Sequence, residues 1–142
     1  MTVLAVIVAH NSAPDLPACL SSLRAPEVSA VVVDNGSTDD SAAVVRAAHP
    51  WAGMLRQENL GFAHACNRGA RHAPSDHLLF LNPDAELRPG ALATLLAVLE
   101  ARGDVAAVGP RTLSGDLTPQ VSFGPRLKIG RASCRERVYV LV

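Results

Sequence analysis

The chain has 142 residues, 49% of them hydrophobic, which allows one globular domain with a buried core and excludes a disordered or fibrous protein. Its 13 basic and 13 acidic residues give a formal net charge of zero, which argues against a broad basic face for nucleic acid. The three cysteines form no CxxC pair and have no histidine at metal-ligand spacing, so we expect a reduced, cytoplasmic protein in which Cys19 and Cys66 fill the core.

The first apolar stretch, TVLAVIVA, predicts a strand over residues 3–9. It is far shorter than the roughly 20 residues that a membrane span requires, so we expect no transmembrane segment, although peripheral attachment at the inner face of the cell membrane stays compatible. His10 and Asn11 follow the strand directly and can line a crevice at its end. Asp15 and Pro17 then predict the start of a helix. Its apolar stripe consists of Leu16, Cys19, Leu20 and Leu23.

A second buried strand, residues 30–34, runs into the turn DNGSTDDS and a helix over residues 39–48 with Thr38 as its N-cap. Asp34 at the strand end can accept hydrogen bonds from a nucleobase N–H or from ribose hydroxyls, and the backbone N–H groups of the Gly-Ser-Thr turn suit an anion. The alternative is a structural turn, in which Asp34 or Asn35 bonds its own backbone. Both interpretations stay open.

A weaker strand, residues 54–57, precedes ENLGFAHACNRGA and a helix over residues 62–72. Gly61 lets the chain turn tightly into this helix, from which Asn67 and Arg68 can reach a phosphate or a sugar. The alternative is an ordinary entry into a helix with an exposed arginine. Neither GxGxxG nor GxxxxGK[ST] occurs, which disfavours dinucleotide-fold dehydrogenases and P-loop nucleotide hydrolases.

The stretch HLLFLNPDAEL is the most informative, because a buried strand over residues 77–82 ends abruptly at Pro83. Asp84 then leaves the sheet at the edge where open α/β sheets bind ligands. Mg²⁺ and Mn²⁺ prefer oxygen ligands and need only one or two protein carboxylates, so Asp84 is sufficient to hold one. The alternative is a solvated Asn-Pro turn in which Asp84 and Glu86 lead into a helix over residues 89–102.

A short strand over residues 105–108 completes an alternation of strands and helices. This order predicts an α/β fold with a mostly parallel sheet that is flanked by helices. The following segment is rich in Gly, Pro, Ser and Thr, and we expect a loop there with at most one short strand near residues 120–123.

The last segment, residues 129–142, reads IGRASCRERVYVLV and differs from the rest in its density of arginine. The string resembles the translation of a common sequencing-library adapter. We therefore expect a non-native tail and a natural domain that is cut near Lys128. The alternative is a basic loop that leads into a last strand, VYVLV.

In this order, VIVAHNS, VVVDNGSTDDS, NLGFAHACNRG, LLFLNPDAEL and PGAL resemble the family 2 glycosyltransferases with the GT-A (Rossmann-like) fold over residues 3–128. The Asn-Pro-Asp variant of that family's Asp-x-Asp motif, together with NLGF and a later GPRTL, is most similar to bacterial rhamnosyltransferases of cell-wall polysaccharide assembly. The resemblance implies that residues 1–128 are the N-terminal, donor-nucleotide-binding part of a domain whose fold is incomplete at its C-terminus.

The resemblance also implies roles for particular residues. Asp34 would bind the nucleoside, Asp84 the metal ion and the diphosphate, and Asn82 the ribose or sugar of the donor. The full donor-nucleotide-binding set that we predict is His10, Asn11, Asp34, Asn35, Gly61, Asn67, Arg68 and Asn82. The implied metal is Mg²⁺ or Mn²⁺, the donor a nucleoside-diphosphate sugar (dTDP-rhamnose or a UDP-sugar), and the acceptor a glycan or lipid-linked molecule. Because Asn82 replaces the first acid of the motif, metal coordination rests on Asp84.

The implied reaction is an inverting transfer in which an acidic general base deprotonates the acceptor hydroxyl. Family members supply that base beyond the point where this chain stops, so we expect the chain to bind nucleotide and to transfer nothing. Two alternatives are a sugar-nucleotide nucleotidyltransferase and a non-catalytic nucleotide-binding α/β module. The first is disfavoured because VIVAHNSAPDL lacks the Gly-rich basic loop that such enzymes place after the first strand. The second, a module that resembles a receiver domain, would need an acidic pair after the first strand and a lysine after the last strand, whereas this chain has only one lysine, Lys128.

Overall fold

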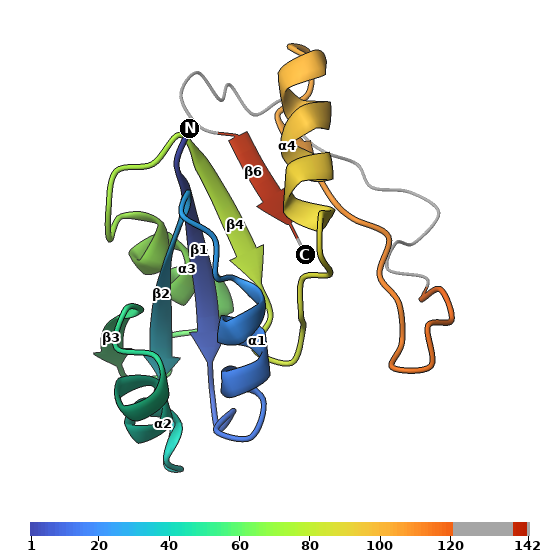
Figure 1. Ribbon diagram of the computed structural model, residues 1–142. Coiled ribbons are helices and arrows are strands. Elements are labelled where there is room, and N and C mark those ends of the chain that lie inside the picture. Colours follow the sequence, from blue (N-terminus) through green and yellow to red (C-terminus); the bar gives the residue numbers. More distant parts are fainter. Residues whose placement is uncertain (121–137, 142) are drawn as a thin grey trace.

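The computed structural model describes residues 1–120 and 138–141. Within these residues six strands form one sheet in the order β3-β2-β1-β4-β6-β5 (Figure 1), and every neighbouring pair is parallel. The predicted α/β fold with a parallel sheet is therefore confirmed. The strands are β1 Val3–Ala9, β2 Val28–Asn35, β3 Gly53–Gln57, β4 His77–Leu81, β5 Ala107–Val108 and β6 Val138–Leu141.

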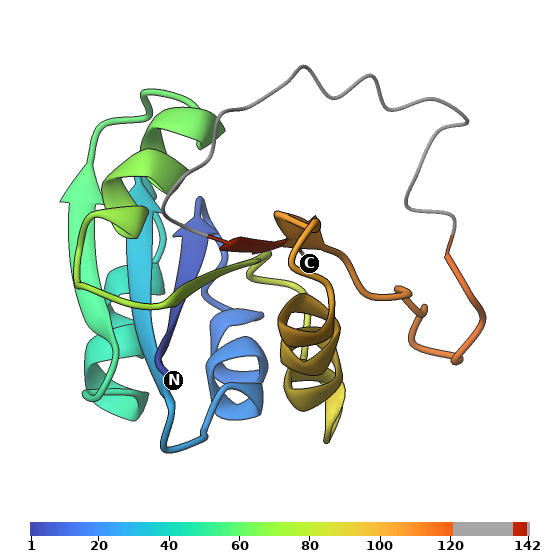
Figure 2. The same cartoon turned by 90° about the horizontal axis from the view of Figure 1, so that it is seen from above.

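The helices of the described residues cover both faces of the sheet. They are α1 Leu16–Ser22, α2 Ser41–Ala48, α3 Phe62–Ala70 and α4 Ala91–Ala101. Figure 2 shows α1, α2 and α4 on one face and α3 alone on the other. Parallel strands need such crossover helices, and because both faces are covered the central strands can be apolar throughout.

The core has one apolar layer on each face of the sheet. Odd-numbered residues of β1, such as Ile7, pack with α1, α2 and α4, while Leu4 and Val6 face the layer of α3. The predicted stripe of α1 is confirmed, since its four apolar side chains are at most 1% exposed. Cys19 belongs to this stripe, whereas Cys66 is only half-buried and does not fill the core as expected.

Helix α2 starts later than predicted, and Thr38 is not its N-cap. The helix begins at Ser41, because the Asp39 carboxylate accepts the N–H of Ser41 at 3.0 Å and the N–H of Ala13 at 3.0 Å. Thr38 instead donates its N–H to the side chain of Asn11. Thr38, the predicted cap, is therefore bound by the loop that follows β1 and lies outside the helix.

The segments after α4 combine confirmed and untested predictions. A bridge between Leu113 and Pro119 makes residues 112–120 a small hairpin, and the strand expected near residues 120–123 lies largely outside the described residues. The interpretation of VYVLV as a last strand is confirmed for Val138–Leu141, which lie between β4 and β5. Residues 129–137 are not described, and the non-native origin of the tail stays a prediction.

The carboxyl ends of the parallel strands meet at one edge of the sheet, at the bottom of Figure 1. From β1 the chain proceeds outward to β2 and β3, and then returns to the other side of β1 with β4. The order of the strands thus reverses between β1 and β4. In open α/β sheets such a switch point opens a ligand-binding crevice at the carboxyl edge.

Candidate functional site

The loops that follow β1 and β2 are joined by hydrogen bonds between them. Nδ1 of His10 lies 3.1 Å from the carbonyl oxygen of Asn35, so this nitrogen carries the proton and donates it. Asn11 accepts the N–H of Thr38 at its Oδ1 (2.8 Å) and donates its own N–H to the Ser37 hydroxyl (3.0 Å). These bonds hold Asn11 in the left-handed region, with a φ of 52°. The exposed ring of His10 is therefore fixed in one orientation.

Asp34 ends β2 with a carboxylate that is only 1% exposed. Its Oδ2 accepts Nε of Arg56 at 2.9 Å, and its Oδ1 accepts the N–H of Ser37 at 2.9 Å. Arg56 itself stays 60% exposed. The structural role considered for Asp34, a bond to its own turn, is thus present. Its role in binding a nucleoside stays a prediction, and Arg56 is the member of the pair that faces solvent.

The loop between β3 and α3 is tied to the end of β2. Asn35 is 4% exposed; its Nδ2 donates to Asn59 at 3.0 Å and its Oδ1 accepts from Gln57 at 2.8 Å. Asn59 also accepts the N–H of Gly61 at 3.2 Å. Gly61 has a φ of 91° and Gly36 a φ of 82°, and Gly36 is also crowded, because a Cβ there would lie 3.0 Å from the Asn59 nitrogen.

Arg68 and Asn67 differ in how far they are available to a ligand. Nη1 of Arg68 donates to the carbonyl oxygen of Arg56 at 2.8 Å and to Oε1 of Gln57 at 3.1 Å. The guanidinium of Arg68 thus anchors α3 to the end of β3. The side chain of Asn67 is exposed and makes no hydrogen bond to the described part of the chain. Binding of a phosphate or sugar by either residue stays a prediction.

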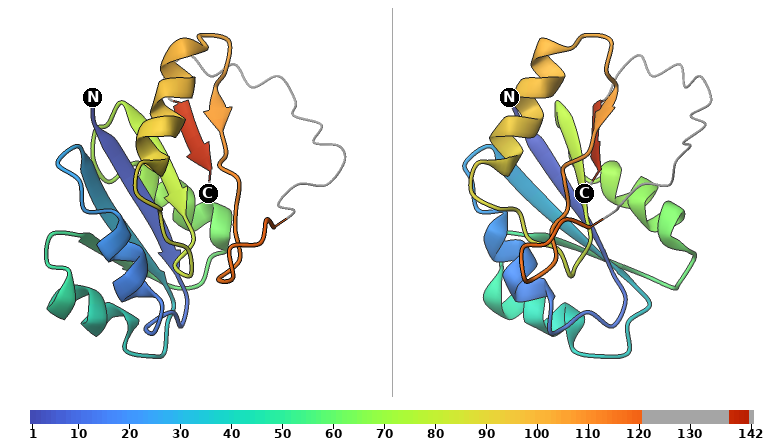
Figure 3. Two further views of the ribbon diagram at one scale, coloured as in Figure 1. Left: turned by 45° about the vertical axis from the view of Figure 1, so that its right-hand side comes forward. Right: turned by 90° about the vertical axis from the view of Figure 1, so that its right-hand side faces the viewer.

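Beyond β4 the exposure of the side chains alternates. Asn82, Asp84, Glu86 and Arg88 are exposed, and the residues between them are half-buried. The carboxylates of Asp84 and Glu86 form no hydrogen bond or ion pair with the described residues. Both line a groove of about 610 Å³ that residues 82–91 form together with residues 110–120, two segments that lie side by side in Figure 3.

The chemistry of this segment fits a hard divalent cation. No group of three His, Cys, Asp or Glu side chains gathers for a metal ion in the part of the chain that the structure describes. A cation at Asp84 would therefore take most of its ligands from water and phosphate, as Mg²⁺ commonly does. Burial, followed by the charges of Asp84, Glu86 and Asp15, raises the pKa of the Cys19 thiol to about 12. The negative potential of these acids favours a cation beside them.

The far wall of the groove is the hairpin of residues 112–120. The N–H of Ser114 donates to the carbonyl of Thr118 at 2.8 Å, and the N–H of Gln120 donates to the carbonyl of Thr112 at 2.9 Å. Asp116 is the acid of this hairpin, and its Oδ1 accepts the hydroxyl and the N–H of Thr118. These bonds, the hydroxyl first, lower the pKa of Asp116. Asp116 thus caps its own turn and does not line the groove.

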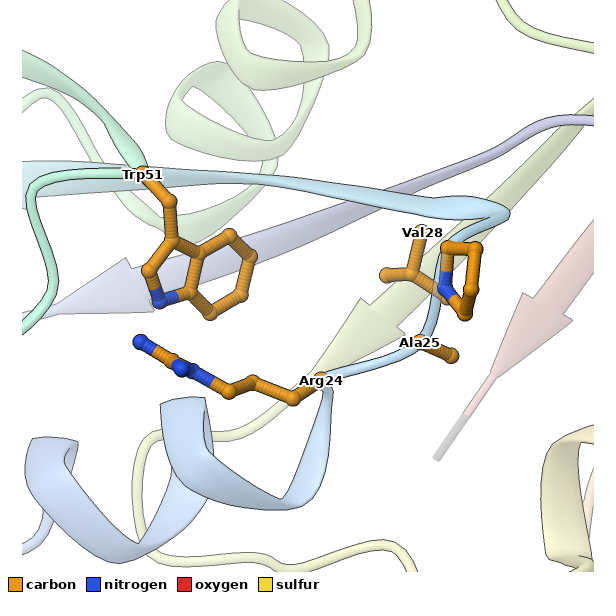
Figure 4. Close-up of a pocket in the computed structure, with 5 residues that line it drawn as sticks. Arg24, Ala25, Val28 and Trp51 are labelled. Carbon is orange, nitrogen blue, oxygen red and sulfur yellow. The ribbon is translucent and has the colours of Figure 1, made fainter.

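A second hollow, of about 390 Å³, lies at the opposite edge of the sheet (Figure 4). It is lined by Arg24, Ala25, Pro26, Val28 and Trp51. The guanidinium of Arg24 lies 6.0 Å from the centre of the Trp51 ring, a cation–π contact. Since β2 begins at Val28, this hollow is at the amino edge of the sheet and holds none of the predicted site residues.

Two residues of the carboxyl edge, Arg56 and Gln57, carry no motif of their own in the sequence, and Asn59 opens the NLGF stretch without being among the predicted site residues. The pairing of β2 with β3 places Arg56 opposite Asp34 and Gln57 opposite Asn35. A signal for them existed, because polar residues occupy the last two positions of a strand that follows Asp34-Asn35. This signal identifies Arg56 and Gln57 as partners of Asp34 and Asn35 only once the register of β2 and β3 is known.

Comparisons with known proteins agree on the kind of domain. The chain matches the family described as "Glycosyl transferase family 2" over residues 4–134. It is 41% identical over 98 residues to the succinoglycan biosynthesis protein ExoU of Rhizobium meliloti, covering 65% of this chain and 29% of ExoU. It is 31% identical over 108 residues to the uncharacterized glycosyltransferase YibD of Escherichia coli, covering 71% of this chain and 31% of YibD.

Among solved structures the chain is similar to S. aureus TarS residues 1–349. The TM-score is 0.68 at 19% identity, over 81% of this chain and 37% of the TarS chain. TarS was also solved in complex with UDP-GlcNAc, with a TM-score of 0.67, and in complex with UDP, with a TM-score of 0.66. At this level of identity the likeness shows a shared fold. The chain spans less than a third of the length of ExoU and of YibD.

Proposed function

Because the chain belongs to glycosyltransferase family 2 and has the GT-A fold, we propose that its carboxyl edge binds a nucleoside-diphosphate sugar. The whole protein would transfer that sugar to a glycan or a lipid-linked acceptor. The complexes of TarS with UDP-GlcNAc and UDP support a nucleotide-sugar donor. Family membership also favours sugar transfer over the nucleotidyltransferase and the non-catalytic module.

The observation that carries the proposal is the network that joins the loops after β1, β2 and β3. His10 bonds Asn35, Asn35 bonds Asn59, and Arg56 bonds Asp34. The exposed Asn82–Asp84 turn lies at the same carboxyl edge, after β4, which pairs with β1. We propose that the nucleoside lies against this rim, where His10 and the Asp34–Arg56 pair offer polar groups. Asn35 is buried, and its side-chain amide is hydrogen-bonded at both its nitrogen and its oxygen, so its part in the site is to position its neighbours.

The diphosphate would lie toward Asp84. The Asp84 carboxylate has no protein partner among the described residues and fits Mg²⁺ or Mn²⁺, while the exposed amide of Asn82 beside it suits a ribose or sugar hydroxyl. A bound dication supplies positive charge that offsets the charge building on the departing diphosphate. The chain's own contribution is to present the carboxylate of Asp84 at the groove, which Glu86 also lines.

The reaction that we propose for the whole protein is a direct displacement with inversion. An acidic base takes the proton of the acceptor hydroxyl, the hydroxyl oxygen bonds the anomeric carbon, and the bond from that carbon to the diphosphate oxygen breaks. We assign no general base among the described residues, because Asp116 is engaged in its own turn. That the 142-residue chain transfers no sugar stays a prediction, which a transfer assay tests.

The donor sugar and the location of the protein are further parts of the proposal. Rhamnose, carried by dTDP, is supported by the Asn-Pro-Asp variant in the sequence, and the name of ExoU refers to the synthesis of another bacterial polysaccharide. None of the described helices is long and apolar enough to cross a membrane. We propose a cytoplasmic protein that works at the inner face of the cell membrane.

Calorimetric titration of the 142-residue chain with UDP and with dTDP tests the donor site. We expect one of the two nucleotides to bind, and His10→Ala to weaken that binding about fivefold, the equivalent of one hydrogen bond. Glu27→Gln, an exposed residue before the amino end of β2, is the control and should bind as the wild type does. A folded chain that binds neither nucleotide would sink the proposal.

A further inference from the structure

The segment that carries Asp84 is attached to helix α1 at both of its ends. At its start, the thiol of Cys19 donates to the carbonyl oxygen of Asn82, with a distance of 3.5 Å from Sγ. At its end, the N–H of Leu87 donates to the hydroxyl oxygen of Ser22 at 3.0 Å. Two side chains one helical turn apart therefore hold a segment whose exposed acids line the groove.

The two anchors are coupled to each other. The Ser22 hydroxyl donates its single hydrogen to the carbonyl oxygen of Cys19 at 2.6 Å, so only its lone pairs remain for the N–H of Leu87. Cys19 is 1% exposed and belongs to the main core cluster, against which Leu87 also packs. The attachment is therefore built into the core of the domain and is not a surface contact.

These anchors hold the backbone from which Asp84 projects. Side chains at every second position, Asn82, Asp84 and Glu86, are exposed, while Ala85 and Leu87 pack against the core. Residues 82–85 form a turn that is closed by a hydrogen bond from the N–H of Ala85 to the carbonyl oxygen of Asn82 at 3.1 Å. The same carbonyl oxygen accepts the Cys19 thiol, so the bond from α1 fixes the turn that carries Asp84.

We propose that Cys19 and Ser22 are positioning residues that hold the turn of residues 82–85 where Asp84 can bind the metal ion of the donor complex. The inference rests on the proposed function. It assigns to α1 a part in the site that no motif of the sequence indicates. The two residues touch neither nucleotide nor metal; they act through the backbone of residues 82–87.

The test compares Ser22→Ala with Ser22→Thr, which keeps the hydroxyl, and with Ser21→Ala, an exposed serine of the same helix. The first readout is the amide exchange of Leu87, which reports the anchor directly. The second is the gain in UDP affinity on adding Mn²⁺. In Ser22→Ala we expect exchange at Leu87 about fivefold faster and a gain about fivefold smaller, with the affinity measured without Mn²⁺ unchanged. Both other variants should match the wild type.

Several results would overturn the inference. One is an equal Mn²⁺ gain in Ser22→Ala and Ser21→Ala. Another is an equal loss of UDP affinity with and without Mn²⁺, which indicates general destabilisation. If Ser22→Ala does not fold, Cys19→Ala and Cys19→Ser test the other end of the segment: the gain should fall in the first and persist in the second. A wild-type chain that binds UDP but shows no Mn²⁺ gain would refute the metal role of Asp84 itself, before any change to α1.

Discussion

Asp34 and Arg56 lie opposite each other on β2 and β3, and their side chains form an ion pair between a carboxylate that is 1% exposed and a guanidinium that is 60% exposed. The buried charge at the end of β2 is thus compensated by a cation that stays open to solvent. Since a buried carboxylate needs partners, Arg56 supports the fold as well as the candidate site.

We expect Arg56→Ala to lower the free energy of unfolding by about 1 kcal/mol, because Asp34 would keep only the N–H of Ser37. The expected loss is small because solvent screens the exposed guanidinium. Urea denaturation measures it, and Arg46→Ala on the exposed side of α2 is the control, with an expected change of less than about 0.5 kcal/mol. Equal losses in both variants would show that the ion pair contributes nothing.

Gly36→Ala should cost more than Gly61→Ala, although both positions have a positive φ, of 82° and 91°. A Cβ at Gly36 would lie 3.0 Å from the backbone nitrogen of Asn59, whereas nothing lies within 4 Å of a Cβ at Gly61. We expect losses of about 2 and about 1 kcal/mol, measured by urea denaturation. The ranking is the test, since equal costs would mean that Asn59 does not crowd Gly36.

Asp39 should shape the stability of the protein in acid. Its hydrogen bonds, that from the Ser41 hydroxyl first, lower its pKa below 3.8. Because the pKa is lower in the folded state, the stabilisation is complete above about pH 4 and is lost as the pH falls through the lowered value. Asp39→Asn should therefore flatten the fall in stability between about pH 4 and pH 2.

Urea midpoints across that pH range measure the effect of Asp39. The matched control is Asp40→Asn, since Asp40 is an exposed neighbour whose side chain makes no hydrogen bond to the described residues. This variant should keep the acid slope of the wild type. If Asp39→Asn keeps the same slope as well, the hydrogen bonds of Asp39 do not contribute to acid stability.

The fold was predictable from sequence because β1, β2 and β4 are apolar runs that end abruptly in polar residues. Such runs are typical of parallel strands covered on both faces. The strand end at Asn82 and Asp84 was recognisable for the same reason, since Pro83 stops the strand and charge follows at once. These signals are local, and they need no knowledge of the neighbouring elements.

The network of the site was not predictable, because it depends on contacts between loops. Strand β3 is only partly buried, so its pattern does not specify the register that brings Arg56 to Asp34. Thr38 was expected to cap α2, yet the side chain of Asn11 from another loop binds it. The attachment of residues 82–87 to Ser22 likewise joins positions 65 residues apart in the chain.

The central claim is that Asp84 holds the metal ion of a donor complex, and the affinity of the chain for UDP with and without Mn²⁺ tests it most directly. The variants to compare are Asp84→Asn and the control Glu100→Gln, an exposed acid on α4. We expect Mn²⁺ to tighten UDP binding by about tenfold or more in the wild type and in Glu100→Gln, and to have no effect in Asp84→Asn. A gain that persists in Asp84→Asn would contradict the claim.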